Sequence, residues 1–443
     1  MRPHATNATV PSGNRRALLG AGSVVFIALL LAGLHIRNYP VLSPIDEVAH
    51  FDNVVKESRF ELVRRGDPVG DDALRAAGCR GIDAPGNLPD CVPVDQQPAA
   101  PLPNFNTAYM HPPLYYVVEG LGARSLRGVG IASNLLLGAR FMDALWFASG
   151  LLLLFAVMGE LGLRGVVRAA ASVMPAIVPF VVYQAATVTN DVTAIPSAAL
   201  VLLAVLRFDR GRWRSWTVSI ACATAVLLRM TNVFGVMVGI GFLCVRWVQK
   251  KDPEDRRRIV HAIVAATATT LVAIAAWIAL IGIVAQVPAS ALPLARMFPK
   301  NFSVDQLFQS VAPLVPPTYG LPDVAFWTRH SFITLQAAAI GWPVVVGPAL
   351  AVARRRTRPE GLALGVPAAA AMLIVGPTMV IINAVSSDTF LGLPIPTRMA
   401  LSVVPGCLAA FAGGIRSRWA SRALVGFVSA GIAGSLVVAG GLM

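Results

Sequence analysis

Apolar stretches long enough to cross a bilayer recur along most of this sequence, and they constrain its fold more than any other feature. A transmembrane helix needs about 20 consecutive apolar residues, because a rise of about 1.5 Å per residue must cover a hydrocarbon core of about 30 Å. Of the 443 residues, 56% are hydrophobic and only 14% are charged. The sequence therefore predicts an all-α polytopic membrane protein.

Eleven transmembrane helices follow from the placement of these stretches. They are expected at residues 17–37, 138–160, 169–188, 191–206, 216–229, 231–245, 260–285, 333–352, 361–382, 399–415 and 423–442. No small-residue cleavage site follows the first stretch, so we expect it to be retained as a span and not removed as a signal peptide.

The net charge of +14 has a simple explanation in the connections between spans. More than half of the 37 Lys and Arg residues lie in alternate connections, at residues 2–16, 164–168, 207–214, 246–258, 354–358 and 416–422. The positive-inside rule makes that side cytoplasmic, with the N-terminus inside and the C-terminus outside a bacterial plasma membrane. No zinc-finger spacing or RNA-binding signature accompanies the charge, so we expect no nucleic-acid partner.

The chain divides into a cytoplasmic tail and two transmembrane modules. The tail is 1–16, the first module is 17–260 with an extracytoplasmic loop at 38–137, and the second, more variable module is 261–443 with outer loops at 286–332 and 383–398. Cys79 and Cys91 both lie in the first loop. An oxidising compartment would favour a disulfide between them.

Residues 216–245 must leave the cytoplasmic side and return to it, because basic segments flank them. They divide into two helices of about 15 residues, each about 22 Å long, which is shorter than the hydrocarbon core. The turn at Arg229 is therefore expected below the outer surface, facing a cavity. An ionisable residue at that depth is a candidate functional residue, although a misplaced boundary would leave Arg229 merely reaching toward the interface.

The segment after the first span combines helix-start signals with acidic residues. Ser43 can cap a helix and Pro44 suits its first turn, which makes Asp46, Glu47 and His50 early helical residues. Asp46 and His50 share one face, whereas Glu47 points about 100° away. On a soluble helix such acids would only complement the helix dipole. Here the helix begins where a span leaves the bilayer, which favours a site, and His50 could orient the carboxylate, bind a metal with it, or only pack.

Two further polar motifs fall on the same side of the membrane. The segment 111–116 (His-Pro-Pro-Leu-Tyr-Tyr) leads into residues 114–127, which are too short for a span and are expected to form an interfacial helix. Asn190 and Asp191 open the fourth span. Structural alternatives stay open for both motifs: a turn for the histidine, and helix capping for Asp191.

In their order along the chain, these features resemble the GT-C glycosyltransferases. The shared pattern is a first span, an outer Asp46-Glu47 pair, a long loop, the 111–116 motif, and Asn190-Asp191 at the start of the fourth span. The pattern is similar to the protein O-mannosyltransferases and the lipid A aminoarabinose transferases, and its Pro-x-Asp-Glu-x-x-His form also resembles a group of bacterial membrane proteins in that superfamily. The resemblance covers residues 17–260, and beyond them only Arg398 before a late span matches.

The resemblance implies inverting transfer of a sugar from a polyprenyl-phosphate donor to an envelope glycan, lipid or protein. In the family the first acidic residue after the first span is the catalytic base, which implies that role for Asp46 with Glu47 beside it. The residues implied to contact the substrates are His50, His111, Asn190 and Asp191. Those implied to hold the lipid phosphate are Arg229, Arg296, Lys300, Arg329 and Arg398. The sequence contains no clear cofactor motif, leaves a divalent metal open, and is shorter than typical members, which leaves acceptor recognition open.

A polytopic transporter or flippase of a lipid-linked envelope precursor is the alternative, because such proteins share buried charge and broken helices. A transporter needs polar groups near the bilayer midplane, whereas the span interiors here are almost purely apolar. No inverted repeat is visible, and the absence of a phosphate-binding loop motif argues against a nucleotide-driven pump. The sequence therefore favours a transferase over a transporter.

Overall fold

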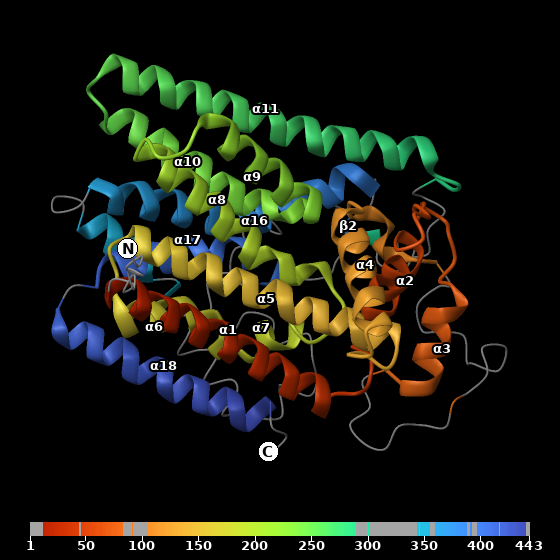
Figure 1. Cartoon of the computed structure of the whole chain (residues 1–443). Helices are drawn as coiled ribbons and strands as arrows, with labels where there is room; N and C mark the ends of the chain where they lie inside the picture. The colour runs from red at the N-terminus through yellow and green to blue at the C-terminus, as the bar shows by residue number, and fades with distance from the viewer. Residues whose placement is uncertain are drawn as a thin grey trace, which may run out of the picture.

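The computed structural model describes most of the chain as a bundle of helices (Figure 1). The described residues are 12–43, 46–82, 91, 105–288, 299–300, 343–344, 346–354, 359–387, 390–391, 397–415 and 417–439. Within them, the strands are limited to β1 (Pro299–Lys300) and β2 (Phe390–Leu391), which pair antiparallel. The predicted all-α class is confirmed for this part of the chain.

Seven of the described helices are long and apolar enough to cross a membrane, which confirms a multi-span membrane protein. The bundle contains α1 (Ser12–Asn38), α5 (Leu135–Glu160), α6 (Gly165–Val173), α7 (Pro179–Gln184), α8 (Ala194–Asp209), α9 (Ser215–Leu228), α10 (Val233–Gln249), α11 (Pro253–Val284), α16 (Pro359–Ser387), α17 (Val404–Gly413) and α18 (Arg418–Ala439). Short 3-10 turns are η2 (Thr107–Met110), η3 (Met174–Ile177), η4 (Asn190–Thr193), η5 (Met230–Asn232) and η9 (Thr397–Val403). The expected spans 169–188, 216–229 and 399–415 correspond to shorter or broken helices, and 333–352 lies largely outside the described residues, so eleven crossings stay a prediction.

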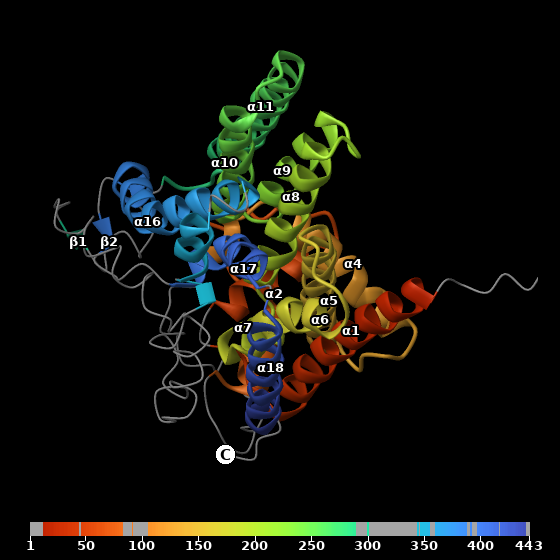
Figure 2. The same cartoon turned by 90° about the vertical axis from the view of Figure 1, so that its left-hand side faces the viewer.

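Ion pairs join several helix termini at one end of the bundle, on the left in Figure 1 and facing the viewer in Figure 2. Glu160, the last residue of α5, pairs with three arginines between residues 207 and 212. Arg246 of α10 pairs with Asp209 of α8. The basic connections near residues 164, 210 and 250 therefore lie together, and their side of the molecule is called the arginine-rich end below.

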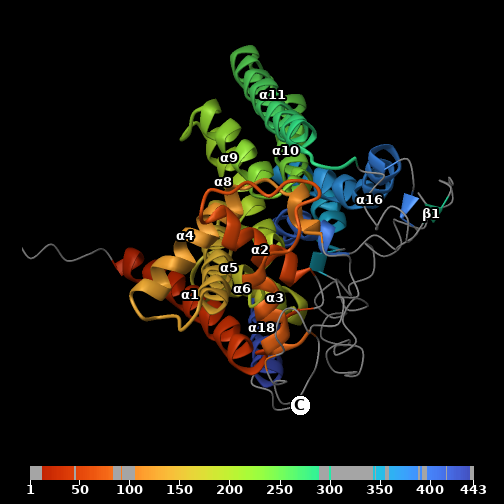
Figure 3. The same cartoon turned by 90° about the vertical axis from the view of Figure 1, so that its right-hand side faces the viewer.

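Three helices outside the bundle cover its opposite end, which faces the viewer in Figure 3. They are α2 (Glu47–Glu57), α3 (Asp71–Arg80) and α4 (Leu114–Gly128). The helix α2 packs on α3 and α4, and α4 packs along α5. Gly120 permits the close approach of α2 and α4, because a Cβ atom there would lie 2.6 Å from the carbonyl oxygen of Val54. The predicted helix at 114–127 is confirmed, and its side chains hold the site described below.

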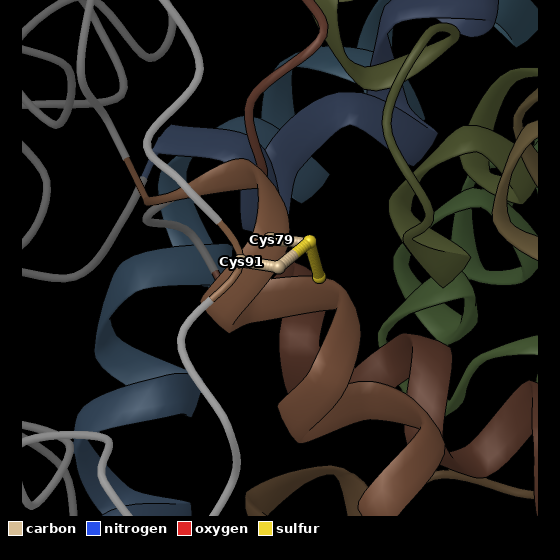
Figure 4. The surroundings of a disulfide bond; sticks show 2 residues. All are labelled: Cys79 and Cys91. Atoms are coloured by element: carbon tan, nitrogen blue, oxygen red, sulfur yellow. A yellow bond between two sulfur atoms is a disulfide. The ribbon is translucent and has the colours of Figure 1, made fainter.

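The helix α3 was not predicted, because its ten residues lie within a stretch rich in Pro and Gly. Asp71 and Asp72 occupy its first turn, where negative charge is favourable next to the helix N-terminus. A disulfide joins Cys79, near its end, to Cys91 (Figure 4). The cysteine pair considered from the sequence is therefore formed in the structure.

Two helices lie between the basic segments as predicted, but only α9 is too short for a span, because Met230–Gln249, which comprises η5 and α10, is long and apolar enough to cross a membrane. The helix α9 has 14 residues, so it is about 21 Å long, and η5 then turns the chain into α10. Arg229 lies between α9 and η5 in an extended conformation, and only 2% of it is exposed. A charged side chain is thus buried inside the bundle at the turn.

Labelling of single cysteines tests the orientation of the bundle. In a background without Cys222, Cys244 and Cys407, a membrane-impermeant maleimide added to intact cells should modify Asp72→Cys on α3. It should spare Lys251→Cys at the arginine-rich end until the cells are permeabilised, because the positive-inside rule places that end in the cytoplasm. Labelling of Lys251→Cys in intact cells would overturn the orientation.

Candidate functional site

Asp46 lies in the connection between α1 and α2, directly before the first residue of α2, and its backbone conformation is not helical. Its φ angle is 59° and its ψ angle is 6°, a left-handed conformation that Asp adopts more readily than most residues. The helix α2 begins at Glu47, so the expectation that Asp46 is a helical residue capped by Ser43 is wrong. The Asp46 carboxylate does not cap the helix. It lies 3.2 Å from the guanidinium of Arg398.

Four charged side chains from distant parts of the sequence meet at this point. Arg398 of η9 places Nη2 against the Asp46 carboxylate and Nε 3.6 Å from Oδ2 of Asp191. The other oxygen of Asp191 pairs with Nη2 of Arg229. Two carboxylates and two guanidiniums therefore form one cluster without net charge, called the four-charge cluster below. The structure brings together four of the residues proposed from the sequence.

The four-charge cluster is mostly buried but open at Asp46. The side chains of Arg229 and Asp191 are 2% and 5% exposed, that of Arg398 is 15% exposed, and that of Asp46 is 38% exposed. Within the described residues, Nε and Nη1 of Arg229 are buried and have no hydrogen-bond partner. Unpaired buried donors are costly, and those of a charged group especially so. In the described chain, Nε and Nη1 of Arg229 are therefore unpaired donors at the inner side of the four-charge cluster.

Glu47 has a structural position that does not fit the catalytic role expected for it. Its side chain is fully buried and forms an ion pair with Arg140 of α5, at 2.8 Å between Nε and Oε1. The Glu47 carboxylate also accepts hydrogen bonds from the backbone N–H groups of Ser43 and Val188. Because each oxygen already has two donors, this carboxylate has no capacity left for a substrate proton.

The loop that carries Asp191 is held from two sides. The backbone N–H of Val188 donates to Glu47, and that of Thr189 donates to Asp143 of α5 at 3.3 Å. Thr189 also caps η4 by accepting a hydrogen bond from the N–H of Asp191. The capping role that the sequence left open for Asp191 is therefore filled by Thr189, which leaves the Asp191 carboxylate to its arginines.

Three rings lie next to the four-charge cluster. His50 shares a hydrogen bond of 2.7 Å with the hydroxyl of Tyr116, and its ring stacks on that of His111 at 5.5 Å between centroids. Burial lowers the pKa of His50 to about 4, against the opposing effect of Asp46 and Asp191. Burial, and then the neighbouring His50, Arg229 and Arg398, lower the pKa of His111 well below its usual value. Both imidazoles are therefore neutral at pH 7.

The remaining predicted residues differ in what the structure says of them. Asn190 is buried beside Asp191, and its Nδ2 has no hydrogen-bond partner among the described residues. Arg296 and Arg329 lie outside the described residues, and Lys300 is described only as part of the backbone of β1. Across the described residues, no group of three or more His, Cys, Asp or Glu side chains could hold a metal ion.

Two residues of this region were not identified from the sequence. Arg140 and Asp143 lie in α5 and are 1% and 0% exposed. Their signal was present, because charged residues within an apolar span are rare and functional by default. The contact of Tyr116 with His50 depends on the packing of α2 against α4, which local sequence does not reveal.

Removal of the Glu47 charge should destabilise the protein strongly. Glu47→Gln leaves Arg140 buried without a counter-charge, and breaking one partner of a buried pair costs about 3–5 kcal/mol. Thermal melts in detergent measure the loss. Glu61→Gln, the same change at an exposed position after α2, is the matched control and should melt like wild type. If the two variants melt at the same temperature, the Glu47–Arg140 ion pair does not stabilise the fold.

Acid should destabilise the protein through His50. Its folded pKa lies below its unfolded value of about 6.5, so its contribution is complete above pH 6.5 and is lost as the pH falls toward 4. The loss at pH 4 is about 3 kcal/mol. Melting temperatures between pH 7 and pH 4 should fall less steeply for His50→Gln than for wild type. His261→Gln, at an exposed position of α11, should keep the wild-type slope.

Comparison with known proteins identifies a family for this chain. The profile of the family described as predicted membrane protein (DUF2142) matches residues 96–352, which include Arg140, Asp191 and Arg229. Asp46 and Arg398 lie outside the matched segment. No curated protein and no solved structure matches the chain. Because the matched segment spans more than half of the chain, this protein belongs to the DUF2142 family of membrane proteins.

Proposed function

We propose that this protein is an inverting glycosyltransferase that moves a sugar from a polyprenyl-phosphate donor to a glycan, lipid or protein of the cell envelope. The four-charge cluster carries the proposal. It places an accessible carboxylate, Asp46, beside Arg398, and Asp191 links Arg398 to Arg229, which has two buried nitrogen donors without a partner in the described chain. A group-transfer reaction with an anionic leaving group needs both functions close together.

Arg229 and Arg398 are the groups proposed to hold the donor phosphate. A guanidinium offers paired donors that match two phosphate oxygens and stays charged near lipid. The Nε and Nη1 groups of Arg229, unpaired among the described residues, lie on different edges of the guanidinium, so each is proposed to donate a single hydrogen bond to a phosphate oxygen. As charge develops on the departing phosphate, these donors stabilise it without moving far, which lowers the barrier to transfer.

Asp46 is the proposed general base. Its carboxylate removes the proton of an acceptor hydroxyl while that oxygen attacks the anomeric carbon of the donor. The bond from the anomeric carbon to the phosphate oxygen breaks, and the lipid phosphate leaves with the electron pair. A single displacement inverts the anomeric centre, as it does in inverting glycosidases. No metal takes part in this scheme, because the arginines supply the positive charge.

The neutral rings and the helices around the cluster fit this chemistry. His50 and His111 add no positive charge at pH 7, so they do not compete with the arginines for the phosphate. The cluster lies at the end of the bundle that carries α2, α3 and α4, away from the arginine-rich end (Figure 1). If the arginine-rich end is cytoplasmic, the site faces the compartment where lipid-linked sugars are consumed and where Cys79 and Cys91 would be oxidised.

A transporter of a lipid-linked precursor is the second candidate. The helical path is broken at η5, between α9 and α10, and at η3, between α6 and α7. Such breaks resemble the discontinuous helices of secondary transporters. A transporter would carry the intact donor lipid across the membrane, whereas a transferase would leave free polyprenyl phosphate and a glycosylated acceptor. Product analysis in proteoliposomes separates the two.

Replacement of Asp46 is the central test. Asp46→Asn keeps the shape of the side chain but cannot accept a proton, so turnover should fall by about 10²- to 10⁴-fold. Donor binding should change only a few-fold, because the arginines hold the phosphate. Asp72→Asn, at an exposed position of α3, is the matched control and should transfer sugar at the wild-type rate.

The measurement is glycosyl transfer by purified protein in lipid, with folding checked by thermal melt. A well-folded Asp46→Asn variant with wild-type turnover would exclude Asp46 as the base. Transport of the donor by wild type, with no release of polyprenyl phosphate, would instead favour the transporter.

A further inference from the structure

A cavity of about 890 Å³ lies at the arginine-rich end, far from the four-charge cluster. It is bounded by the last turn of α17, the first three turns of α18, and the helical residues 346–353. The two consecutive helices α17 and α18 pack mainly on different neighbours: α17 on α16 and α8, and α18 on α6 and α1. Figure 2 shows α18 diverging from α17 at this end, and the cavity occupies the wedge between them.

The lining of the cavity is almost entirely apolar. Its side chains include Val346, Leu350, Phe411, Leu424 and Phe427, and no Asp or Glu is found among the described residues that line it. The volume lies in the upper part of the range of about 300–1,000 Å³ that is common for ligand pockets. An apolar space of this size between membrane helices matches a hydrocarbon chain in its chemistry.

Among the described residues, one cationic side chain lines this cavity. Arg354 lines it, is exposed, and donates a hydrogen bond to the carbonyl oxygen of Gly414. Arg418 and Arg422 add positive charge in the first two turns of α18, the helix that contributes Ala420 and Leu424 to the lining. An apolar chamber below a cluster of arginines is complementary to a lipid with a negative headgroup.

Gly413 supplies an independent indication that the space is open. It lines the cavity, and a Cβ atom built on it would have no heavy atom within 4 Å. A larger side chain at this position would therefore enter the cavity without displacing the described protein. Gly426 of α18 also has open space around its Cβ position but does not line the cavity.

We propose that this cavity binds one acyl chain of an anionic phospholipid from the leaflet at the arginine-rich end, with Arg354 contacting the phosphate. The lipid would fill the wedge between α17 and α18 and so fix α18 against the bundle. The site differs from the four-charge cluster in position, leaflet and chemistry. It does not depend on the proposed glycosyltransferase activity.

The test measures lipid that copurifies with the full-length protein. Protein reconstituted in equal amounts of phosphatidylglycerol and phosphatidylcholine is extracted in mild detergent, washed, and analysed by quantitative mass spectrometry of bound lipid. Wild type should retain a stoichiometric amount of phosphatidylglycerol. Gly413→Leu should lose most of it, because the new side chain fills the cavity, whereas the matched control Gly426→Leu should retain the wild-type amount.

Arg354→Gln tests the headgroup contact. Loss of one arginine near a lipid phosphate should reduce the preference for phosphatidylglycerol over phosphatidylcholine about fivefold. Ala420→Leu, which fills the same cavity from α18, replaces Gly413→Leu if that variant fails to fold in a thermal melt. Equal lipid retention by Gly413→Leu and Gly426→Leu, or wild-type retention of both lipids without preference, would overturn the proposal.

Discussion

The buried ion pair between Glu47 and Arg140 determines where the candidate site can form. It joins the start of α2 to α5, and the same carboxylate binds the backbone of Ser43 and Val188. The guanidinium of Arg140 binds the carbonyl groups of Tyr39 and Val41 in addition. One pair thus fixes the turn after α1 and the loop before η4. Asp46 and Asp191, the two carboxylates of the site, follow these two segments. The ion pair therefore fixes the distance between them.

The site itself depends on charge compensation and not on a single strong contact. A buried carboxylate or guanidinium alone would pay a large desolvation penalty. Asp191 and Arg229 are buried together, so that the attraction between their opposite charges offsets the cost of desolvation. Asp46 stays partly in contact with solvent. The cluster is therefore rigid at its inner side and open at its outer side. Under the proposed mechanism, this gradient in exposure matches a phosphate-binding role for Arg229 and a base role for Asp46.

The sequence predicted the parts of the fold that depend on short-range information. Helix length, apolar content and the position of arginines were sufficient for the seven long apolar helices, the short helix α9 and the buried Arg229. Glu47 could not be assigned in the same way, because its role depends on Arg140, which is 93 residues away. The left-handed backbone of Asp46 was missed for a related reason. The residues that flank Asp46 are held by tertiary contacts of Glu47 and Arg140, whereas the Ser-Pro-x-Asp sequence by itself is typical of a helix start.

Arg398 is 352 residues from Asp46 along the chain, and this separation has a consequence for biogenesis. Membrane helices are inserted in order as the ribosome delivers them, and loop closure over such a distance is slow and entropically costly. During most of synthesis, Asp46 would lack its arginine while α1 to α11 are already assembled. The charge that completes the cluster arrives only with η9, just before the last helices. A nascent or truncated chain that ends before η9 would therefore carry an inserted bundle with an incomplete four-charge cluster.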